Sequence, residues 1–113
     1  MAQMSKTNAH PLDRLFATIE SRRGADPAVS YTAKLLGQGK AKCAKKLGEE
    51  AVETALAAVG DDREALIAES ADLLYHLLVV WAACGIAPAD IYTALAARES
   101  RSGVDEKACR RAT

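Results

Sequence analysis

The sequence predicts an all-α protein of four to five helices. Half of its 113 residues are apolar but only 4% are aromatic, and the apolar share is dominated by alanine and leucine, which favour helix over strand. Apolar residues recur at helical spacing, and glycine or proline stands at the breaks. We expect one domain over residues 1–113, with an ordered core of about 11–98 and a polar, flexible tail at 99–113.

The first two helices are short. Pro11 occupies a favoured first helical position, and Gly24 ends the apolar pattern that follows it. Ser30 can cap a helix over residues 31–36. The glycine-containing segment 37–39 ends that helix, and we expect it to be the most flexible internal stretch. The apolar residues of the first helix lie at i, i+3, i+4 and i+7: Leu12, Leu15, Phe16 and Ile19.

Three further helices follow. Residues 40–59 carry a helical apolar pattern, and the segment 60–62 makes a tight break that ends in an acidic N-cap. The next helix spans residues 63–84 and ends at Gly85. Pro88 opens the last helix, which has a modest apolar face.

Residues 73–83 are apolar around nearly the whole circumference of their helix. A helix that is apolar all round is buried all round. With so few helices in the chain, we expect a second subunit to supply the cover, so that dimerisation, or a higher homo-oligomer, completes the bundle. The alternative is a helix central to a monomeric bundle. The run is too short to cross a bilayer, which takes about 20 apolar residues, so no membrane is expected.

The charge and cysteine content narrow the class of protein. Lysine plus arginine and aspartate plus glutamate balance at 15 each, so no global field draws the chain to nucleic acid or to an acidic membrane. Cys43, Cys84 and Cys109 cannot all pair and lack the spacing of a zinc or redox motif. Residues 1–10 are polar, without the apolar core of a signal peptide. We therefore expect a cytoplasmic protein.

Five carboxylates lie beside apolar faces of two successive predicted helices: Glu49, Glu50 and Glu53 on the first, and Glu69 and Asp72 on the second. At about 100° per residue, the first three fall within one arc of roughly 100°. The second pair, three residues apart, also shares a face. Two such helices packed antiparallel would merge the groups into one acidic site. Hard cations neutralise such clusters, and an all-oxygen ligand set suits Mg²⁺ or Mn²⁺ better than zinc.

The alternative is that these are ordinary solvated helix charges with partners on the same helix. For Glu49 this interpretation has a specific basis, because Lys45 and Lys46 lie one turn before it. For Asp72 it is weaker. Aspartate is a poor mid-helix residue, and this one opens the most apolar stretch of the chain, where an unpaired charge is costly.

Lysines precede the first carboxylates across a glycine-containing loop: Lys34, Lys40, Lys42, Lys45 and Lys46. They either solvate a helix face, which is the usual role of a charge run, or hold phosphates beside a metal site. His76, one turn after Asp72, can orient a carboxylate, touch substrate or be a satisfied core histidine.

Two segments carry a family resemblance. Residues 45–53, Lys-Lys-Leu-Gly-Glu-Glu-Ala-Val-Glu, and residues 69–76, Glu-Ser-Ala-Asp-Leu-Leu-Tyr-His, closely resemble the phosphoribosyl-ATP pyrophosphohydrolase family of histidine biosynthesis. The likeness runs from about Leu12 to Arg98. The bare EExxE and ExxD pattern is shared by the wider MazG-like all-α nucleotide pyrophosphohydrolases, and the flanking residues narrow it. Ser70 and the composition of residues 41–44 are mild departures that remove no expected ligand.

The resemblance implies a MazG-like bundle that hydrolyses phosphoribosyl-ATP, a small nucleotide, to phosphoribosyl-AMP and pyrophosphate. It implies magnesium held by Glu50, Glu53, Glu69 and Asp72. Glu49 would complete a second metal site or position the attacking water. The substrate-binding residues we expect are Lys34, Lys45, Lys46 and His76, with at least one lysine on the extra ribose phosphate that distinguishes this substrate from ATP.

Two other functions compete. A housecleaning pyrophosphohydrolase acting on noncanonical nucleoside triphosphates would use the same five carboxylates. A helical assembly module without chemistry would neither bind magnesium nor turn over a nucleotide.

Overall fold

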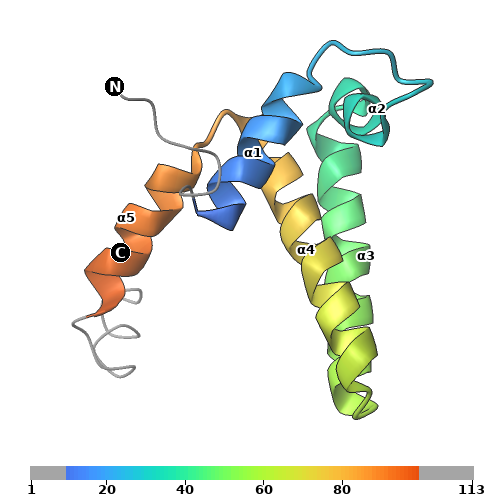
Figure 1. Cartoon of the computed structure of the whole chain (residues 1–113), viewed down its shortest axis with the longest axis vertical. Helices are drawn as coiled ribbons and strands as arrows, with labels where there is room; N and C mark the ends of the chain where they lie inside the picture. The colour runs from blue at the N-terminus through green and yellow to red at the C-terminus, as the bar shows by residue number, and fades with distance from the viewer. Residues whose placement is uncertain (1–9, 100–113) are drawn as a thin grey trace.

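The computed structural model describes residues 10–99, which form five helices and no strand (Figure 1). The all-α prediction is confirmed. The helices are α1 (Pro11–Ser21), α2 (Tyr31–Gln38), α3 (Lys40–Val59), α4 (Arg63–Cys84) and α5 (Pro88–Glu99). Glu99 closes α5, and the remainder of the predicted flexible tail lies outside the described residues, as do Cys109 and residues 1–9.

The helix boundaries follow the predicted caps. The Ser30 hydroxyl accepts a hydrogen bond from the backbone N–H of Ala33 at 3.0 Å, and the Asp62 carboxylate accepts one from the N–H of Ala65 at 3.0 Å. Each bond satisfies an N–H group that the helix itself leaves unpaired. Gly85 ends α4 in the left-handed region, at φ 72°.

The predicted linker at 37–39 is shorter than expected. α2 continues through Gly37 and Gln38, so that Gly39 alone separates it from α3. Gly39 has φ 94°, a conformation that L side chains rarely adopt, and this single residue makes the turn between the two helices.

α3 and α4 pack against each other as an antiparallel hairpin, the longest feature of the molecule (Figure 1). α1 crosses the C-terminal half of α4, and α2 packs on α3 and α4 near the same end. The tip of the hairpin therefore projects away from the other helices. α5 leaves the end of α4 in a different direction and contacts α1.

The core lies where α1, α2 and the start of α3 surround the C-terminal half of α4. Its buried residues are Ile19, Ala33, Leu35, Cys43, Leu78, Val79, Trp81 and Ala82. Two polar bonds reinforce this junction. The Arg23 guanidinium donates to the Ala82 carbonyl at 2.8 Å, and the Cys43 thiol donates to the Leu35 carbonyl at 3.3 Å.

The chain's own helices cover part of the apolar surface of residues 73–83 in α4, which we expected a second subunit to cover. Leu78, Val79 and Trp81 are buried by the chain's own helices. The large apolar side chains that stay exposed on the hairpin lie nearer its tip: Val52, Leu56 and Val59 on α3, and Ile67 and Leu74 on α4. Dimerisation stays a prediction, and these two stripes, not Trp81, are the surface available for it.

Among the described helices, α4 is long and apolar enough to pass a membrane-span test based on length and composition. The core helix of a soluble protein passes the same test. The buried residues of α4 include the polar His76, and they pack against other helices of the chain.

Candidate active site

The antiparallel packing of α3 and α4 brings three of the five predicted carboxylates together. One oxygen from each of Glu50, Glu69 and Asp72 lies within 4.8 Å of the other two. Glu50 and Glu69 are half-buried, whereas Asp72 is exposed. The cluster therefore has a partly desolvated floor and an open side through which a nucleotide can approach.

Thr54 holds the two helices in register at this level. Its hydroxyl lies 2.8 Å from the Glu50 carbonyl on its own helix and 3.1 Å from the Glu69 carbonyl on α4. A hydroxyl has one proton, so it donates to these two acceptors as a shared bond. Both acceptors belong to residues of the cluster, which makes Thr54 a direct brace between the carboxylate-bearing backbones.

The three carboxylates fit a divalent cation. In an octahedral magnesium site the metal–oxygen distance is about 2.1 Å, so opposite ligand oxygens are about 4.2 Å apart. The 4.8 Å spread exceeds this only slightly, and small side-chain rotations would close it. All three donors are oxygens, the set that suits magnesium or manganese rather than zinc.

The carboxylates of the cluster repel one another. Burial raises the pKa of the Glu50 carboxyl, and the neighbouring carboxylates of Glu53, Asp72 and Glu69 raise that pKa further. A cation would reverse both effects, because it would stabilise the ionised form of Glu50.

Glu53 and Glu49 occupy different surroundings. Glu53 is exposed and lies close enough to Glu50 to raise the pKa of Glu50. Glu53 is not a member of the tight group formed by Glu50, Glu69 and Asp72. Glu49 turns to Lys46, with 3.2 Å between Oε1 and Nζ. That hydrogen bond is the main cause of the lowered pKa of Glu49 and of the raised pKa of Lys46. For Glu49, the partner on the same helix that the sequence suggests is present.

His76 is buried, with 6% of its surface exposed. Its Nδ1 is the one buried side-chain polar atom within residues 10–99 that lacks a hydrogen-bond partner. Burial and the charge of Lys46 lower the pKa of His76, while Asp72 and Glu49 oppose them. The imidazole thus lies close enough to the acidic site to sense its charges.

Of the three lysines expected to bind substrate, Lys46 is the one that the structure connects to the site. It is half-buried, pairs with Glu49 and lies one turn before Glu50. Lys34 and Lys45 are exposed, and no hydrogen bond or ion pair joins either side chain to the described residues.

The sequence analysis gives no role to the aromatic cluster beside His76, although Tyr75 belongs to the segment 69–76 that carries the family resemblance. The rings of Tyr31 and Tyr75 stack with centroids 6.5 Å apart, and the His76 ring meets both edge-on, at 6.1 and 5.0 Å. The Tyr75 and Thr32 hydroxyls share a short hydrogen bond. The available signal was compositional: in a chain with 4% aromatic residues, two tyrosines border the motifs.

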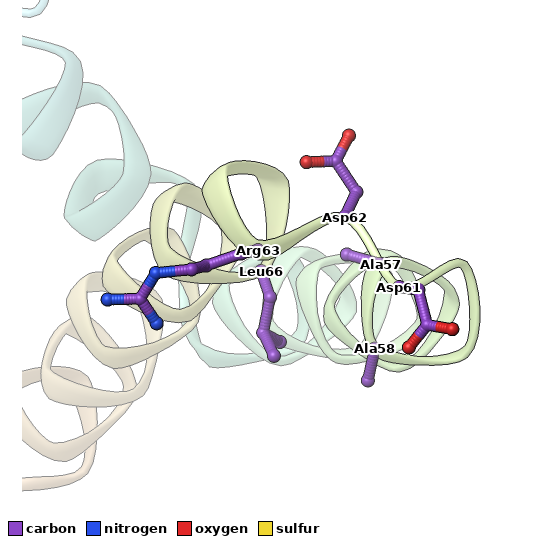
Figure 2. A pocket seen from close by; sticks show the side chains of 6 residues that line it. All are labelled: Ala57, Ala58, Asp61, Asp62, Arg63 and Leu66. Atoms are coloured by element: carbon purple, nitrogen blue, oxygen red, sulfur yellow. The ribbon is translucent and has the colours of Figure 1, made fainter.

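The described surface includes two hollows of note. One, of about 290 Å³, lies at the hairpin tip and is lined by Ala57, Ala58, Asp61, Asp62, Arg63 and Leu66 (Figure 2). The side chains of Asp62 and Arg63 point in different directions there, so no polar groups converge on a ligand (Figure 2). The other hollow, of about 420 Å³, lies between the end of α1 and the start of α2 and includes Tyr31.

The geometry agrees with what the chain resembles in sequence. Residues 12–99 match the family model described as phosphoribosyl-ATP pyrophosphohydrolase. The chain belongs to the phosphoribosyl-ATP pyrophosphohydrolase family. The match spans all five carboxylates and the whole of α2 to α5.

Proteins named phosphoribosyl-ATP pyrophosphatase are similar over nearly the whole chain. The one from Azospirillum brasilense is 56% identical over 106 residues, which cover 94% of this chain and 96% of the relative. That from Parvibaculum lavamentivorans is 58% identical, covering 91% and 94%. That from a Jannaschia species is 57% identical, covering 88% and 98%. As a member of the phosphoribosyl-ATP pyrophosphohydrolase family, the chain thus matches these relatives along almost their full length.

Proposed function

We propose that this chain hydrolyses phosphoribosyl-ATP to phosphoribosyl-AMP and pyrophosphate, the second step of histidine biosynthesis. The observation that carries the proposal is the convergence of Glu50, Glu69 and Asp72 within 4.8 Å, beside Lys46, in a chain of this family. We propose that residues 1–113 form a single catalytic domain and that it acts in the cytoplasm.

The carboxylates hold divalent metal in this proposal, with Glu50, Glu69 and Asp72 as ligands and Glu53 joining from the next turn of α3. Bound magnesium supplies a Lewis acid and lowers the pKa of a coordinated water. Manganese has the same preference for oxygen ligands. We propose that Glu49, which pairs with Lys46, completes a second metal site or orients the attacking water.

The chain's own cations and its histidine handle the substrate. Lys46 lies about 6 Å along α3 from Glu50, measured between the backbones of residues four apart, so its ammonium group can neutralise a phosphate of the triphosphate. Lys45 and Lys34 are exposed and can contact substrate phosphates from the solvent side. His76 is buried, and burial lowers its pKa and so disfavours its charged form, which suits it to orient groups beside Asp72.

A second copy of the chain is the partner that we propose. The two stripes on the hairpin, 52, 56 and 59 on α3 and 67 and 74 on α4, expose large apolar side chains. The hairpin projects beyond the chain's own core, so no other described helix can cover it. Burial of these side chains would stabilise a homodimer or a higher oligomer. Nucleic acid and membrane are not among the partners proposed.

The test of this function is a pyrophosphate-release assay with magnesium. Phosphoribosyl-ATP is compared with ATP and with several noncanonical nucleoside triphosphates at equal concentration. We expect kcat/KM to be far higher for phosphoribosyl-ATP and turnover to vanish when magnesium is chelated. Equal rates on all the triphosphates would instead assign the chain to the housecleaning pyrophosphohydrolases, and absence of turnover on every substrate would support an assembly module.

A further inference from the structure

The hollow of about 420 Å³ lies between the end of α1 and the start of α2. Its lining residues are Arg22, Ala25, Val29, Ser30, Tyr31 and Thr32. Ala25 and Val29 of its lining belong to the loop that joins the two helices (Figure 1). The hollow is separate from the carboxylates, which lie on α3 and α4.

Arg22 provides an uncompensated cation at this hollow. Its side chain is exposed, and its guanidinium makes no hydrogen bond or ion pair within residues 10–99. The neighbouring Arg23 is different, because it is bonded to Glu20 and to the Ala82 carbonyl. A guanidinium presents paired N–H donors that match the oxygens of a phosphate.

Tyr31 connects the hollow to the acidic site. Half of its surface is exposed, and its ring is held by the stack on Tyr75 and by the edge of His76. His76 and Lys46 sense each other's charge, and Lys46 pairs with Glu49. Ring contacts therefore join Tyr31, which lines the hollow, to Tyr75 and His76, and Lys46 is close enough to Tyr31 and His76 to interact electrostatically with both.

The aromatic cluster also has an unmet hydrogen bond. The buried Nδ1 of His76 has no partner, although buried polar atoms in folded proteins nearly always have one. The His76 ring meets the Tyr31 ring edge-on, and His76 is close enough to Asp72 and Glu49 to sense their charges. The aromatic cluster therefore contains one buried nitrogen without a hydrogen-bond partner.

We propose that Arg22 and Tyr31 form the subsite for the phosphoribosyl end of phosphoribosyl-ATP. The Arg22 guanidinium pairs with the 5′-phosphate of the extra ribose, and the Tyr31 ring packs against the ribose and adenine. This inference rests on the proposed function and assigns its substrate specificity. The triphosphate, at the carboxylates and Lys46, is common to ATP, so discrimination requires contacts at the other end of the substrate.

The assignment differs from the one that the sequence alone predicts, in which lysines at 34–46 contact the extra ribose phosphate. Lys46 already neutralises Glu49, and its place one turn before Glu50 puts it at the triphosphate. Arg22 is the cation that lines a hollow of sufficient size next to an aromatic wall.

The experiment compares Arg22→Gln with wild type on phosphoribosyl-ATP and on ATP. Loss of a charge-assisted hydrogen bond should lower kcat/KM for phosphoribosyl-ATP by about 10- to 100-fold. The loss should fall mainly in KM, with ATP hydrolysis unchanged. Arg63→Gln, at the hairpin tip, is the matched control and should leave both substrates unaffected. Arg22 is exposed, so the melting temperature should not change.

Tyr31 is tested by two substitutions. Tyr31→Phe keeps the ring and should retain the preference for phosphoribosyl-ATP, whereas Tyr31→Leu should lower it about tenfold or more, in line with the contribution of one aromatic stack. If the two variants showed the same preference for phosphoribosyl-ATP over ATP, the Tyr31 ring would not be part of the subsite.

A binding measurement separates this inference from the catalytic proposal. Phosphoribosyl-AMP and AMP are titrated into the wild type without magnesium, followed by calorimetry. Tighter binding of phosphoribosyl-AMP that disappears in Arg22→Gln supports the subsite, even if the wild type fails to hydrolyse phosphoribosyl-ATP and the proposed reaction is wrong. Equal affinity of the wild type for the two ligands, or equal effects of Arg22→Gln on phosphoribosyl-ATP and ATP turnover, would overturn it.

Discussion

Large apolar side chains are buried at one end of the α3–α4 hairpin and exposed at the other. At the end near α1 and α2, Leu78 and Val79 are 0% exposed. Near the tip, Val59 is 83% exposed and Ile67 is 56% exposed. Both regions are regular helix, and both pair α3 with α4. The difference comes from α1 and α2, which cover one end and do not reach the other.

The acidic cluster lies between these two regimes. Glu50 and Glu69 are half-buried, so their charges repel in a partly desolvated setting, while Asp72 stays exposed. A fully covered hairpin would shut out a nucleotide, and a fully bare one would let water screen the charges. A position between the covered end of the hairpin and its exposed tip therefore lets a nucleotide reach the carboxylates and keeps their charges only partly screened by water.

The core end is tested most severely by Trp81→Asp. Trp81 is buried by the chain's own helices, so a charge there loses a large apolar contact and is left without a partner. We expect a loss of about 3–5 kcal/mol or more in the free energy of unfolding. Urea unfolding measures it. A variant as stable as the wild type would place the Trp81 ring at an outer surface and contradict the closed core.

The boundary is tested by Asp72→Asn. Removing one charge relieves repulsion, so the metal-free variant should be as stable as the wild type or more so. Turnover should fall by about 100-fold or more, because a metal ligand is weakened. In the wild type, magnesium should raise the melting temperature by binding linkage, and less so in the variant. Asp61→Asn, at the hairpin tip, is the control. Wild-type turnover of Asp72→Asn at limiting magnesium would exclude Asp72 as a ligand.

Lys46→Ala tests the cation that accompanies the carboxylates. If Lys46 neutralises the triphosphate, kcat/KM should fall equally for phosphoribosyl-ATP and for ATP, by about 1.5–3 kcal/mol of transition-state binding. Lys45→Ala should act more weakly, because that side chain is exposed and acts on Glu49 only through its charge, without the hydrogen bond that Lys46 makes. A larger loss of kcat/KM on phosphoribosyl-ATP than on ATP would indicate that a lysine contacts the extra ribose phosphate, as the sequence alone predicts.

Leu56→Asp tests the exposed apolar stripes near the tip of the hairpin. Leu56 is 66% exposed in the single chain, so the substitution should change the stability of a monomer by no more than about 1 kcal/mol. In a dimer it should prevent assembly, since a charge would enter an apolar interface. Sedimentation at micromolar concentration compares the two proteins. A wild type that is already a stable monomer would refute the proposed dimer.

The smallest effect concerns the pH dependence near the aromatic cluster. The pKa of His76 is lowered in the folded protein by burial and by Lys46, so the unfolded chain takes up the proton first as pH falls below about 6.5. Stability should therefore decline as pH falls through that range. His76→Phe should flatten this decline in thermal melts recorded between pH 7 and 5.5. Identical slopes for the two proteins would mean that His76 titrates as in the unfolded chain.

The local features of the fold follow from short-range chemistry. Ser30 and Asp62 cap helices because their side chains reach an N–H group three residues on, and Gly85 ends α4 because it alone adopts the left-handed conformation cheaply. Helical spacing likewise places Glu69 and Asp72 on one face. The prediction of a flexible linker at residues 37–39 was wrong for a reason that is also local. A single glycine can end one helix and begin the next without a linker.

The sequence by itself determined the helices, their caps, the carboxylate spacing and the family, since each depends on residues within a few positions of one another or on direct similarity. Only the tertiary structure decided that Glu50 joins Glu69 and Asp72 while Glu49 turns to Lys46, and that Trp81 is covered from within the chain. It likewise set Tyr31 against His76, 45 positions later. Such contacts depend on how the helices pack, because helical periodicity specifies which face a residue shares but not what that face meets.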